Sequence, residues 1–308
     1  MIQFYACPNN QLERILLPEN GCWIDVVRPD SPERQALHQE YAVPRDFIAY
    51  ALDPDERPRL EREADCTMLV LQVSHWLGHD SLTPYDTVPL GVMLTPNQII
   101  TVCAHRHTVL LDLKRGKFKI SSTTDQARFL LQVLWRTAQR FLLDLRAIER
   151  RLESLEQRLS KSTKNKELLE LMRLEKSLVY FKTALRSNIS LLERLKNEEA
   201  LIGTHAAMLE DVLIETSQAL EMTDIALSIL GTTTSAFAAV IGNNLNEVVR
   251  MLTIVTVMVA LPTWITGVFG MNVPLPWQNE PWSFAAVMLL CVVAVVGLLT
   301  LLKNRGWL

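Results

Sequence analysis

The sequence predicts a mainly α-helical membrane protein with an α/β domain at its N-terminus, a long-helix stalk and two C-terminal transmembrane helices. Short apolar and β-branched runs in the N-terminal third indicate strands. No proline occurs between Pro96 and Pro262, which favours long helices over that stretch. Between Arg250 and Lys303 the only charged residue is Glu280, which indicates that this end of the chain crosses a membrane.

Composition excludes several classes of protein. The chain has 308 residues and a formal net charge of -3, which argues against a nucleic-acid partner because phosphate binding favours a clustered basic surface. Its five cysteines are scattered without a CxxC pair, as expected in a reducing cytosol. The N-terminal segment MIQFYACPNN has no basic region before an apolar stretch, so we expect no secretory signal peptide and a largely cytoplasmic chain.

Residues 1–124 are predicted to form a cytoplasmic α/β domain. Short apolar runs alternate there with helical patches, and Thr95-Pro96-Asn97 is typical of a turn. We expect strands at 22–27, 66–73, 87–94 and 98–103, and helices at 32–41 and 46–52.

Residues 125–204 are predicted to form a cytoplasmic helical hairpin. Capping residues at 121–125 precede the first helix, and a polar break at 160–166 separates two apolar seams. Asn188 replaces one apolar step of the second seam, a substitution that can fix the register of paired helices. A free-standing dimeric coiled coil is the alternative. The seams are Phe141, Leu145, Ile148, Leu152, Leu155 and Leu159, then Leu171, Leu174, Leu178, Phe181, Leu185, Leu192 and Leu195.

A third helix is predicted from about His205 into the first transmembrane segment. Residues 205–250 would form the stalk, and the whole helix of roughly 65 residues would be about 100 Å long at 1.5 Å per residue. Its seam is smaller and more polar than those of the hairpin, which we interpret as a surface flanking a water-filled axis. The seam comprises Val212, Thr216, Ala219, Thr223, Ala226, Leu230, Thr233, Phe237 and Val240.

Residues 251–308 are predicted to form the membrane domain, with spans at about 251–269 and 282–302 and an external loop at 270–281. Each span is close to the length of about 20 apolar residues that crosses the hydrocarbon core. A hairpin buried in a soluble core is the alternative. Basic residues flank the spans and are missing from the loop, so we expect a multi-pass protein of the inner (plasma) membrane with both termini in the cytoplasm.

Small and hydroxyl-bearing residues repeat at spacings of three and four along the first span. They form a stripe on one helix face: Asn246, Val249, Thr253, Thr256, Ala260, Thr263, Gly267 and Gly270. Such a stripe can let helices pack closely, or it can line a pore that a hydrated cation passes. The pore requires an oligomer, because two spans per chain cannot enclose a water-filled path.

The residues around the first span resemble those of the CorA family of divalent-cation channels. The resemblance rests on Asn243-Asn244-Leu245-Asn246-Glu247, Pro262, Gly267-Val268-Phe269-Gly270-Met271-Asn272 and the C-terminal Lys303-Asn304-Arg305-Gly306-Trp307-Leu308. It is strong over residues 244–308 and weaker at residues 52–60.

The resemblance implies a homopentamer with a CorA-like funnel fold, in which the first spans line the pore and the second spans lie outside them. By this analogy Gly270-Met271-Asn272 forms an outer selectivity ring. Asn246, Thr263 and Gly267 would face the pore. The ring would hold a hydrated cation, which suits Mg²⁺ because that ion dehydrates reluctantly. Glu280 is the only acid in the external loop, so we expect weak attraction of cations at the mouth.

Asp211 matches the position at which members of that family place an aspartate that senses Mg²⁺ between subunits. A solvated helix carboxylate is the alternative. His75 with His79, and His105 with His107, have spacings that metal ligands use and are weaker candidates. A further acidic cluster is interleaved with arginines, and we interpret it as a salt-bridged surface. It comprises Asp53, Asp55, Glu56, Glu61, Glu63 and Asp65 with Arg57, Arg59 and Arg62.

The sequence contains no phosphate-binding loop, nucleophile elbow or catalytic metal motif, so we expect neither an enzyme nor an organic cofactor. The hypothesis is a homopentameric channel in membrane lipid that takes up Mg²⁺ and is held closed when cytoplasmic Mg²⁺ bridges its subunits. A Zn²⁺, Co²⁺ or Ni²⁺ transporter of the same fold is one alternative. A membrane-anchored helical sensor or scaffold without a pore is the other.

Overall fold

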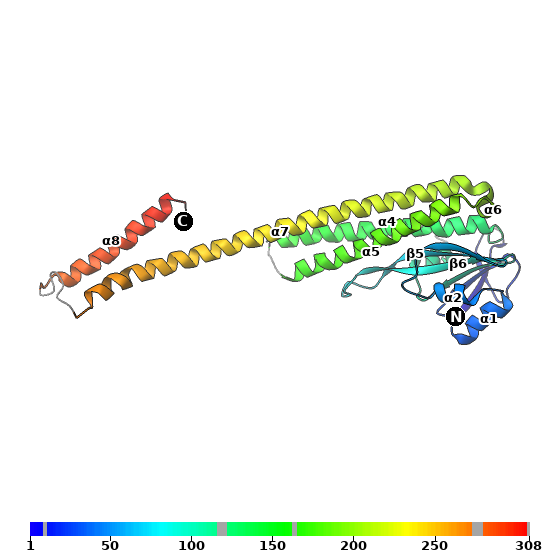
Figure 1. The fold of residues 1–308 in the computed structure, drawn as a ribbon, viewed down its shortest axis with the longest axis horizontal. Helices are drawn as coiled ribbons and strands as arrows, with labels where there is room; N and C mark the ends of the chain where they lie inside the picture. The colour runs from blue at the N-terminus through cyan, green and yellow to red at the C-terminus, as the bar shows by residue number, and fades with distance from the viewer. Residues whose placement is uncertain (9–10, 116–121, 162–164, 273–279, 307–308) are drawn as a thin grey trace. The chain divides into compact units, whose positions relative to one another are not determined.

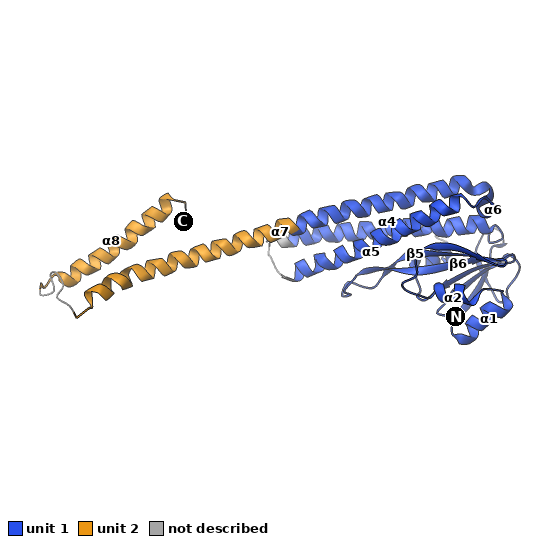
Figure 2. Cartoon of the chain, in the orientation of Figure 1, with its two compact units in different colours: residues 1–234 blue, residues 235–308 orange. Residues whose placement is uncertain are grey.

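The computed structural model describes residues 1–8, 11–115, 122–161, 165–272 and 280–306. The chain divides into two compact units, residues 1–234 and residues 235–308 (Figure 2). The expected fold class is confirmed, because an α/β part at the N-terminus is followed by long helices and by two apolar C-terminal helices (Figure 1).

A seven-stranded sheet organises the first unit. Its order is β2-β1-β3-β7-β6-β5-β4, in which β3 and β7 are parallel and the other neighbours are antiparallel. The strands are β1 (Ile2–Ala6), β2 (Glu13–Ile15), β3 (Trp23–Val27), β4 (Arg59–Glu63), β5 (Cys66–Trp76), β6 (Tyr85–Leu94) and β7 (Ile99–Cys103). The four strands predicted from apolar runs correspond to β3, β5, β6 and β7.

Three strands lack the pattern that predicts a strand. β4 reads Arg-Leu-Glu-Arg-Glu and lies at one edge of the sheet, where polar side chains reach water. β2 has three residues and lies at the other edge. β1 lies between β2 and β3 and buries only Tyr5 fully. β1, β2 and β4 are held in place by pairing with neighbouring strands, and a local sequence pattern does not predict such pairing.

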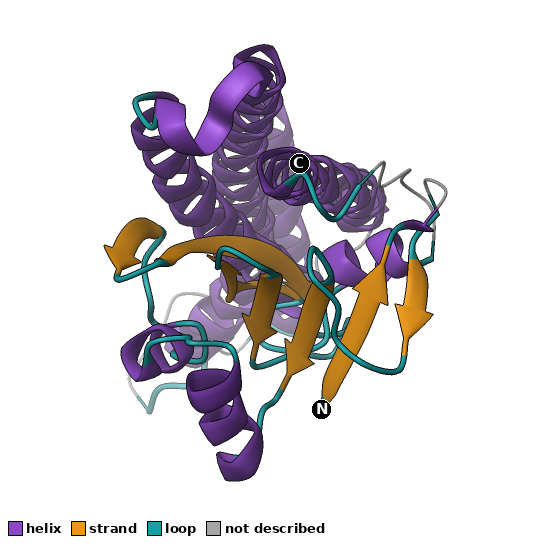
Figure 3. Cartoon of the chain, turned by 90° about the vertical axis from the view of Figure 1, so that its right-hand side faces the viewer, coloured by secondary structure: helices purple, strands orange, loops and turns teal. Residues whose placement is uncertain are grey.

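Helices cover both faces of the sheet (Figure 3). One face carries α1 (Ser31–Glu40) and α2 (Arg45–Tyr50). The other carries α3 (Thr108–Lys114) and the long helices α4 (Gln126–Lys161) and α5 (Asn165–Lys196). Because both faces are covered, the central strands read as continuous apolar runs instead of alternating ones.

The predicted seams of α4 and α5 pack within the chain, contrary to the dimeric coiled-coil alternative. Phe141 of α4 meets Phe181 of α5 edge to face, with ring centroids 5.0 Å apart. Asn188 anchors α5 to the sheet: its side chain accepts a hydrogen bond from Gln72 N at 3.0 Å and donates one to the Gln72 carbonyl at 2.8 Å. Gln72 lies opposite Pro89, which has no amide hydrogen to donate.

The predicted third helix is confirmed. A short helix α6 (Glu199–Ile202) and a 3₁₀ turn (Gly203–His205) lead into α7 (Ala206–Phe269), a continuous helix of 64 residues with Pro262 inside it. The boundary between the two units lies within α7.

The small, polar seam of α7 packs against the α4–α5 hairpin over its N-terminal part. The seam side chains from Val212 to Leu230 are buried. Their interpretation as a surface on a water-filled axis is therefore wrong over this range. Thr216 and Thr223 tolerate burial because their hydroxyls donate to helix carbonyls four residues earlier, each at 2.7 Å.

Candidate functional site

The second unit contains the two apolar helices expected to cross a membrane. They are the C-terminal part of α7 and α8 (Ser283–Asn304), and both are long and apolar enough for a span. Large apolar side chains on them are exposed, among them Leu252, Val259, Trp264 and Leu289. A hairpin buried in a soluble core would instead cover these side chains within the chain. Their exposure favours a surrounding of lipid or of further protein.

One face of α7 is shielded in this unit. Ile254 and Ile265 are buried, and Met258 and Val268 are partly buried, so the shielded positions recur at helical spacing. The other helix that the structure describes in this unit is α8, and its Cys291 is buried as well. We therefore take these sides as the ones with which the two helices face each other.

The predicted stripe lies on the opposite side of α7. At about 100° per residue, its centre lies roughly 150° around the helix from the shielded face. All of its members are exposed: Asn246, Val249, Thr253, Thr256, Ala260, Thr263, Gly267 and Gly270. Packing between the two helices of one chain therefore does not account for the stripe.

The three threonines of the stripe bond to their own helix. The hydroxyls of Thr253, Thr256 and Thr263 each donate to the carbonyl four residues earlier at 2.8 Å. A hydroxyl has one hydrogen and two acceptor lone pairs, and here the hydrogen is used inside the helix. The stripe therefore presents oxygen lone pairs, which are acceptors for hydrogen bonds from water.

The tripeptide Gly270-Met271-Asn272 follows the end of α7. The amide of Gly270 donates to the Thr266 carbonyl at 2.9 Å, and that of Met271 donates to the Val268 carbonyl at 3.3 Å. A Cβ at Gly270 would lie 3.3 Å from the Thr266 carbonyl oxygen, so a larger residue is poorly accommodated. Met271 and Asn272 are exposed. Most of the expected external loop, residues 273–279, lies outside the described residues.

Asp211 is exposed near the start of α7 and makes no ion pair or side-chain hydrogen bond with any described residue. Its neighbour Glu210 pairs with Lys196 at 2.8 Å. Within the described part of the chain, no group of three or more histidine, cysteine, aspartate or glutamate residues is placed to hold a metal ion. A regulatory ion at Asp211 would therefore need ligands from another copy of the chain or from water.

The acidic cluster that begins at Asp53 is salt-bridged in part, at two of its six acids. Arg59 pairs with Glu56 at 3.4 Å and with Glu61 at 3.0 Å. Carboxylates that are already paired with arginine on the surface are poor candidates for binding a cation.

The histidine pairs do not acquire the geometry that their spacing suggested. His75 lies on β5 and His79 in the loop beyond it, so the two do not share a helix face. The rings of His75 and His105 have centroids 5.6 Å apart. His107 is buried, and neither of its ring nitrogens has a hydrogen-bond partner among the described residues.

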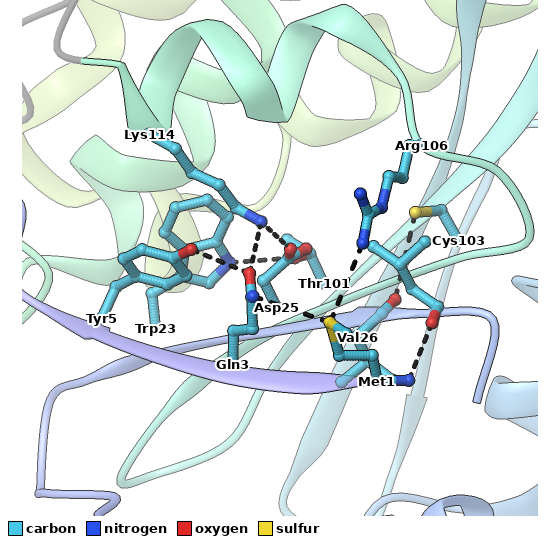
Figure 4. A network of polar contacts seen from close by, with 11 residues as sticks. Met1, Gln3, Tyr5, Trp23, Asp25, Val26, Thr101, Cys103, Arg106 and Lys114 are labelled. Atoms are coloured by element: carbon cyan, nitrogen blue, oxygen red, sulfur yellow. Dashed lines mark hydrogen bonds and ion pairs between the residues drawn. The ribbon is translucent and has the colours of Figure 1, made fainter. Parts of the chain in front are cut away.

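A polar network that sequence reasoning missed lies in the first unit (Figure 4). Asp25, on β3, is 1% exposed and forms an ion pair with Lys114 at the end of α3. Thr101, on the parallel neighbour β7, donates a hydrogen bond to Asp25 at 3.0 Å. The available signal was an acid inside an otherwise apolar strand, because a buried carboxylate needs a partner.

An α/β unit followed by long helices and two apolar helices defines a two-span membrane protein with a large non-membrane part. A family model described as CorA-like Mg²⁺ transporter protein matches residues 18–304. The chain belongs to this family, which is a family of membrane transporters and not a class of enzymes.

Relatives match nearly the whole chain. The cobalt/magnesium transport protein CorA of Methanocaldococcus jannaschii is 26% identical over 296 residues, which cover 93% of this chain and 91% of that protein. The zinc transport protein ZntB of Yersinia enterocolitica is 22% identical, with 96% and 90% covered. The complete structure of the CorA magnesium transporter from M. jannaschii aligns with a TM-score of 0.86 at 23% identity, covering 100% of this chain and 99% of that one.

Proposed function

We propose that this protein is a homopentameric channel for divalent cations, with Mg²⁺ as its preferred substrate, and that ions pass along the exposed stripe of α7. The stripe is the observation that carries the proposal. It has no fixed charge, lies away from α8 and presents hydroxyl oxygens. Membership of the CorA-like Mg²⁺ transporter family supports the same function.

The stripe becomes a path only in an oligomer. One chain supplies two apolar helices, which cannot enclose water, whereas copies around a common axis would bring their stripes together. The number five comes from the family resemblance. The exposed apolar side chains of α8, such as Leu289 and Val293, suit a position in lipid outside the α7 helices. Arg250 and Lys303 favour cytoplasmic termini, because basic residues stay on that side.

The tripeptide Gly270-Met271-Asn272 of each copy would form the selectivity ring. Asn272 is exposed beyond the end of α7, and its side-chain carbonyl is a hydrogen-bond acceptor. Acceptors arranged in a ring bind the water molecules of a hydrated ion without replacing them. This mode suits Mg²⁺, which keeps several waters when it binds to proteins.

The choice among divalent ions rests on this lining. Hydroxyl and amide oxygens match an ion that keeps its water, whereas Zn²⁺ prefers nitrogen and sulfur ligands, which the stripe lacks. The printed names of relatives nevertheless include transport of cobalt with magnesium and of zinc. Zn²⁺, Co²⁺ and Ni²⁺ are therefore the alternatives within the same class.

Asp211 is proposed to sense cytoplasmic Mg²⁺. Its carboxylate is exposed and has no partner among the described residues, and hard cations bind carboxylate oxygens. An ion shared between Asp211 and a neighbouring copy would hold the α7 helices in the closed arrangement. Loss of the ion would shift the population toward the open arrangement, since the ion binds only one of the two.

Ion flux into liposomes tests the proposed path. Purified wild-type protein is expected to admit Mg²⁺, and Asn272→Ala to lower the rate about tenfold, which corresponds to about 1.4 kcal/mol. Asn304→Ala, which removes the same amide at the end of α8, is the matched control and should keep the wild-type rate. Equal uptake by Asn272→Ala and wild type would refute the selectivity ring, and no uptake by any form would favour the scaffold without a pore.

Two further measurements in the same liposomes identify the preferred ion and test the proposed regulation by cytoplasmic Mg²⁺. Competition by Co²⁺, Ni²⁺ and Zn²⁺ against Mg²⁺ ranks the substrates, and stronger transport of Zn²⁺ would overturn the assignment of Mg²⁺. Asp211→Asn is expected to retain uptake when Mg²⁺ is high on the cytoplasmic side. A variant that closes at the same Mg²⁺ concentration as wild type would remove Asp211 from the sensing site.

A further inference from the structure

A cavity of about 250 Å³ lies in the first unit. It is lined in part by Asp25 and Lys114, the ion pair that Figure 4 shows. It opens between β1, β3 and α3, and no motif in the sequence marks it. Its lining combines apolar side chains with a small number of charged and polar ones. The lining residues used below are Val27, Arg106, His107, Leu110, Leu111 and Lys114.

The negative charge of Asp25 is already neutralised. Lys114 pairs with one oxygen of the carboxylate, and the hydroxyl of Thr101 donates to the other at 3.0 Å. Lys114 also donates to the Gln3 side-chain carbonyl at 3.2 Å. An ammonium group has three hydrogens, so one donor of Lys114 is not assigned to these partners.

Arg106 has unused hydrogen-bonding capacity, whereas the ring nitrogens of the neighbouring His107 are buried. The guanidinium of Arg106 makes one polar contact with the described residues, a weak one to the sulfur of Met1 at 3.8 Å. His107 is 3% exposed, and both of its ring nitrogens lack partners among the described residues. Burial lowers the pKa of His107 to about 3, with smaller contributions from the neighbouring His75 and from the positive charge of Lys114, so the ring is neutral.

We propose that this cavity binds a small oxyanion, a carboxylate or phosphate group on a compact molecule, between Arg106 and Lys114. The charges of Asp25 and Lys114 cancel, so Arg106 leaves the lining used here with an excess positive charge. Arginine suits carboxylate and phosphate because its planar fork donates two parallel hydrogen bonds. A cation is disfavoured by the same charges.

The size and walls of the cavity limit the ligand. Its volume lies just below the usual range of about 300–1,000 Å³ for small-molecule pockets, so the ligand is the size of a small metabolite. Val27, Leu110 and Leu111 offer an apolar wall for the carbon part of an organic acid. The site lies within the first unit and does not depend on the proposed channel function.

Binding to the purified full-length protein tests the site. Isothermal titration with succinate and with inorganic phosphate, each against sodium chloride of equal ionic strength, is expected to show saturable binding of at least one of the two. Arg106→Gln should weaken that binding about tenfold or more, the equivalent of about 1.4 kcal/mol. Arg115→Gln removes the same charge from an exposed arginine outside the lining and should bind like wild type.

A second variant separates binding from folding. His107→Leu removes a buried imidazole whose ring nitrogens have no partner among the described residues and are not exposed to the cavity, so it should keep both the melting temperature and the binding of the oxyanion. Binding of succinate alone identifies a carboxylate ligand, and binding of phosphate alone a phosphate. The proposal is overturned if neither probe binds saturably to wild type, or if Arg106→Gln binds as tightly as Arg115→Gln.

Discussion

Two buried polar side chains in the first unit differ in whether they have hydrogen-bond partners. Asn188 uses both ends of its amide on the backbone of Gln72. His107 has no partner among the described residues, and burial is the largest cause of its lowered pKa. The hydrogen bonds of Asn188 fix the packing of α5 on the sheet. The buried ring of His107 has to stay neutral in the folded protein, so the free energy of unfolding depends on pH.

Replacing Asn188 is expected to destabilise the first unit strongly. In Asn188→Leu the amide and the carbonyl of Gln72 lose their buried partner, which costs about 1–3 kcal/mol for each group. Thermal unfolding of the purified full-length protein should show a clear drop in melting temperature. Ser187→Ala, which removes an exposed hydroxyl on the same helix, serves as the control and should change little. Equal melting temperatures for the two variants would contradict the anchoring role of Asn188.

His107 is expected to weaken the fold in mild acid. Its folded pKa of about 3 lies below the ordinary value of 6.5, so protons bind more tightly to the unfolded chain. The stability that depends on a neutral ring is therefore complete above pH 6.5 and is lost as the pH falls toward 3. By pH 5 the total loss relative to alkaline pH is about 2 kcal/mol, because the slope approaches about 1.36 kcal/mol per pH unit below pH 6.5.

The control for this pH dependence is His107→Leu, which has no ring to protonate. The difference in melting temperature between pH 7 and pH 5 should be smaller in this variant than in wild type. His75 also has a lowered pKa because of burial, so part of the acid sensitivity is expected to persist. Identical pH profiles would mean that His107 is not buried in the folded protein.

At the scale of single elements, α7 uses threonine in two different settings. Thr216 and Thr223 face the α4–α5 hairpin and are buried, while Thr256 and Thr263 are exposed in the second unit. All four bond to the carbonyl four residues earlier. The two threonines of each pair are separated by the same number of residues, so periodicity identifies both the seam and the stripe. It does not reveal what each set of side chains faces, which is why the sequence analysis wrongly placed the seam beside a water-filled axis.

Removing hydroxyls from the stripe is expected to slow transport. Thr256→Val with Thr263→Val keeps the size of both side chains and deletes the outward lone pairs, so the path becomes less favourable for hydrated ions. Mg²⁺ flux into liposomes should fall about tenfold or more, with each lost hydrogen bond worth about 1 kcal/mol. Thr300→Val on α8 deletes a hydroxyl that also bonds within its helix and should leave the flux unchanged. A similar loss in both would favour a general effect on membrane packing.

At the scale of the whole molecule, the sequence was most informative about elements that a pattern within one segment predicts. Segments free of charge predicted the two apolar helices, and apolar seams predicted α4, α5 and α7. The missed strands and the missed ion pair depend on partners that are distant in the chain, whereas the short helix α3 was missed although it is a local element. β1, β2 and β4 form by pairing, and Asp25 meets Lys114 only because β3 and α3 come together in the fold. A pattern within one segment does not predict contacts between segments that are distant in the chain.

In the candidate site too, some features could be predicted from the sequence and others required the structure. The positions of the stripe were predicted from spacing alone, and its exposure opposite the shielded face of α7 required the structure. The selectivity ring and the sensing role of Asp211 stay predictions, because both would form between copies of the chain. The cavity beside Lys114 is lined by residues of β1, β3, β7 and α3 and of the segment before α3, so no local pattern in the sequence predicts it.

The chemistry of the stripe has a consequence for energy coupling. None of its side chains gains or loses a proton near neutral pH, and the hydroxyl hydrogens of its threonines are engaged by the helix. A proton therefore has no acidic or basic side chain to occupy along this face of α7. If the proposed uptake responds to a pH gradient, the response has to arise from groups elsewhere in the chain, and a divalent ion on the stripe itself would move down its own electrochemical gradient.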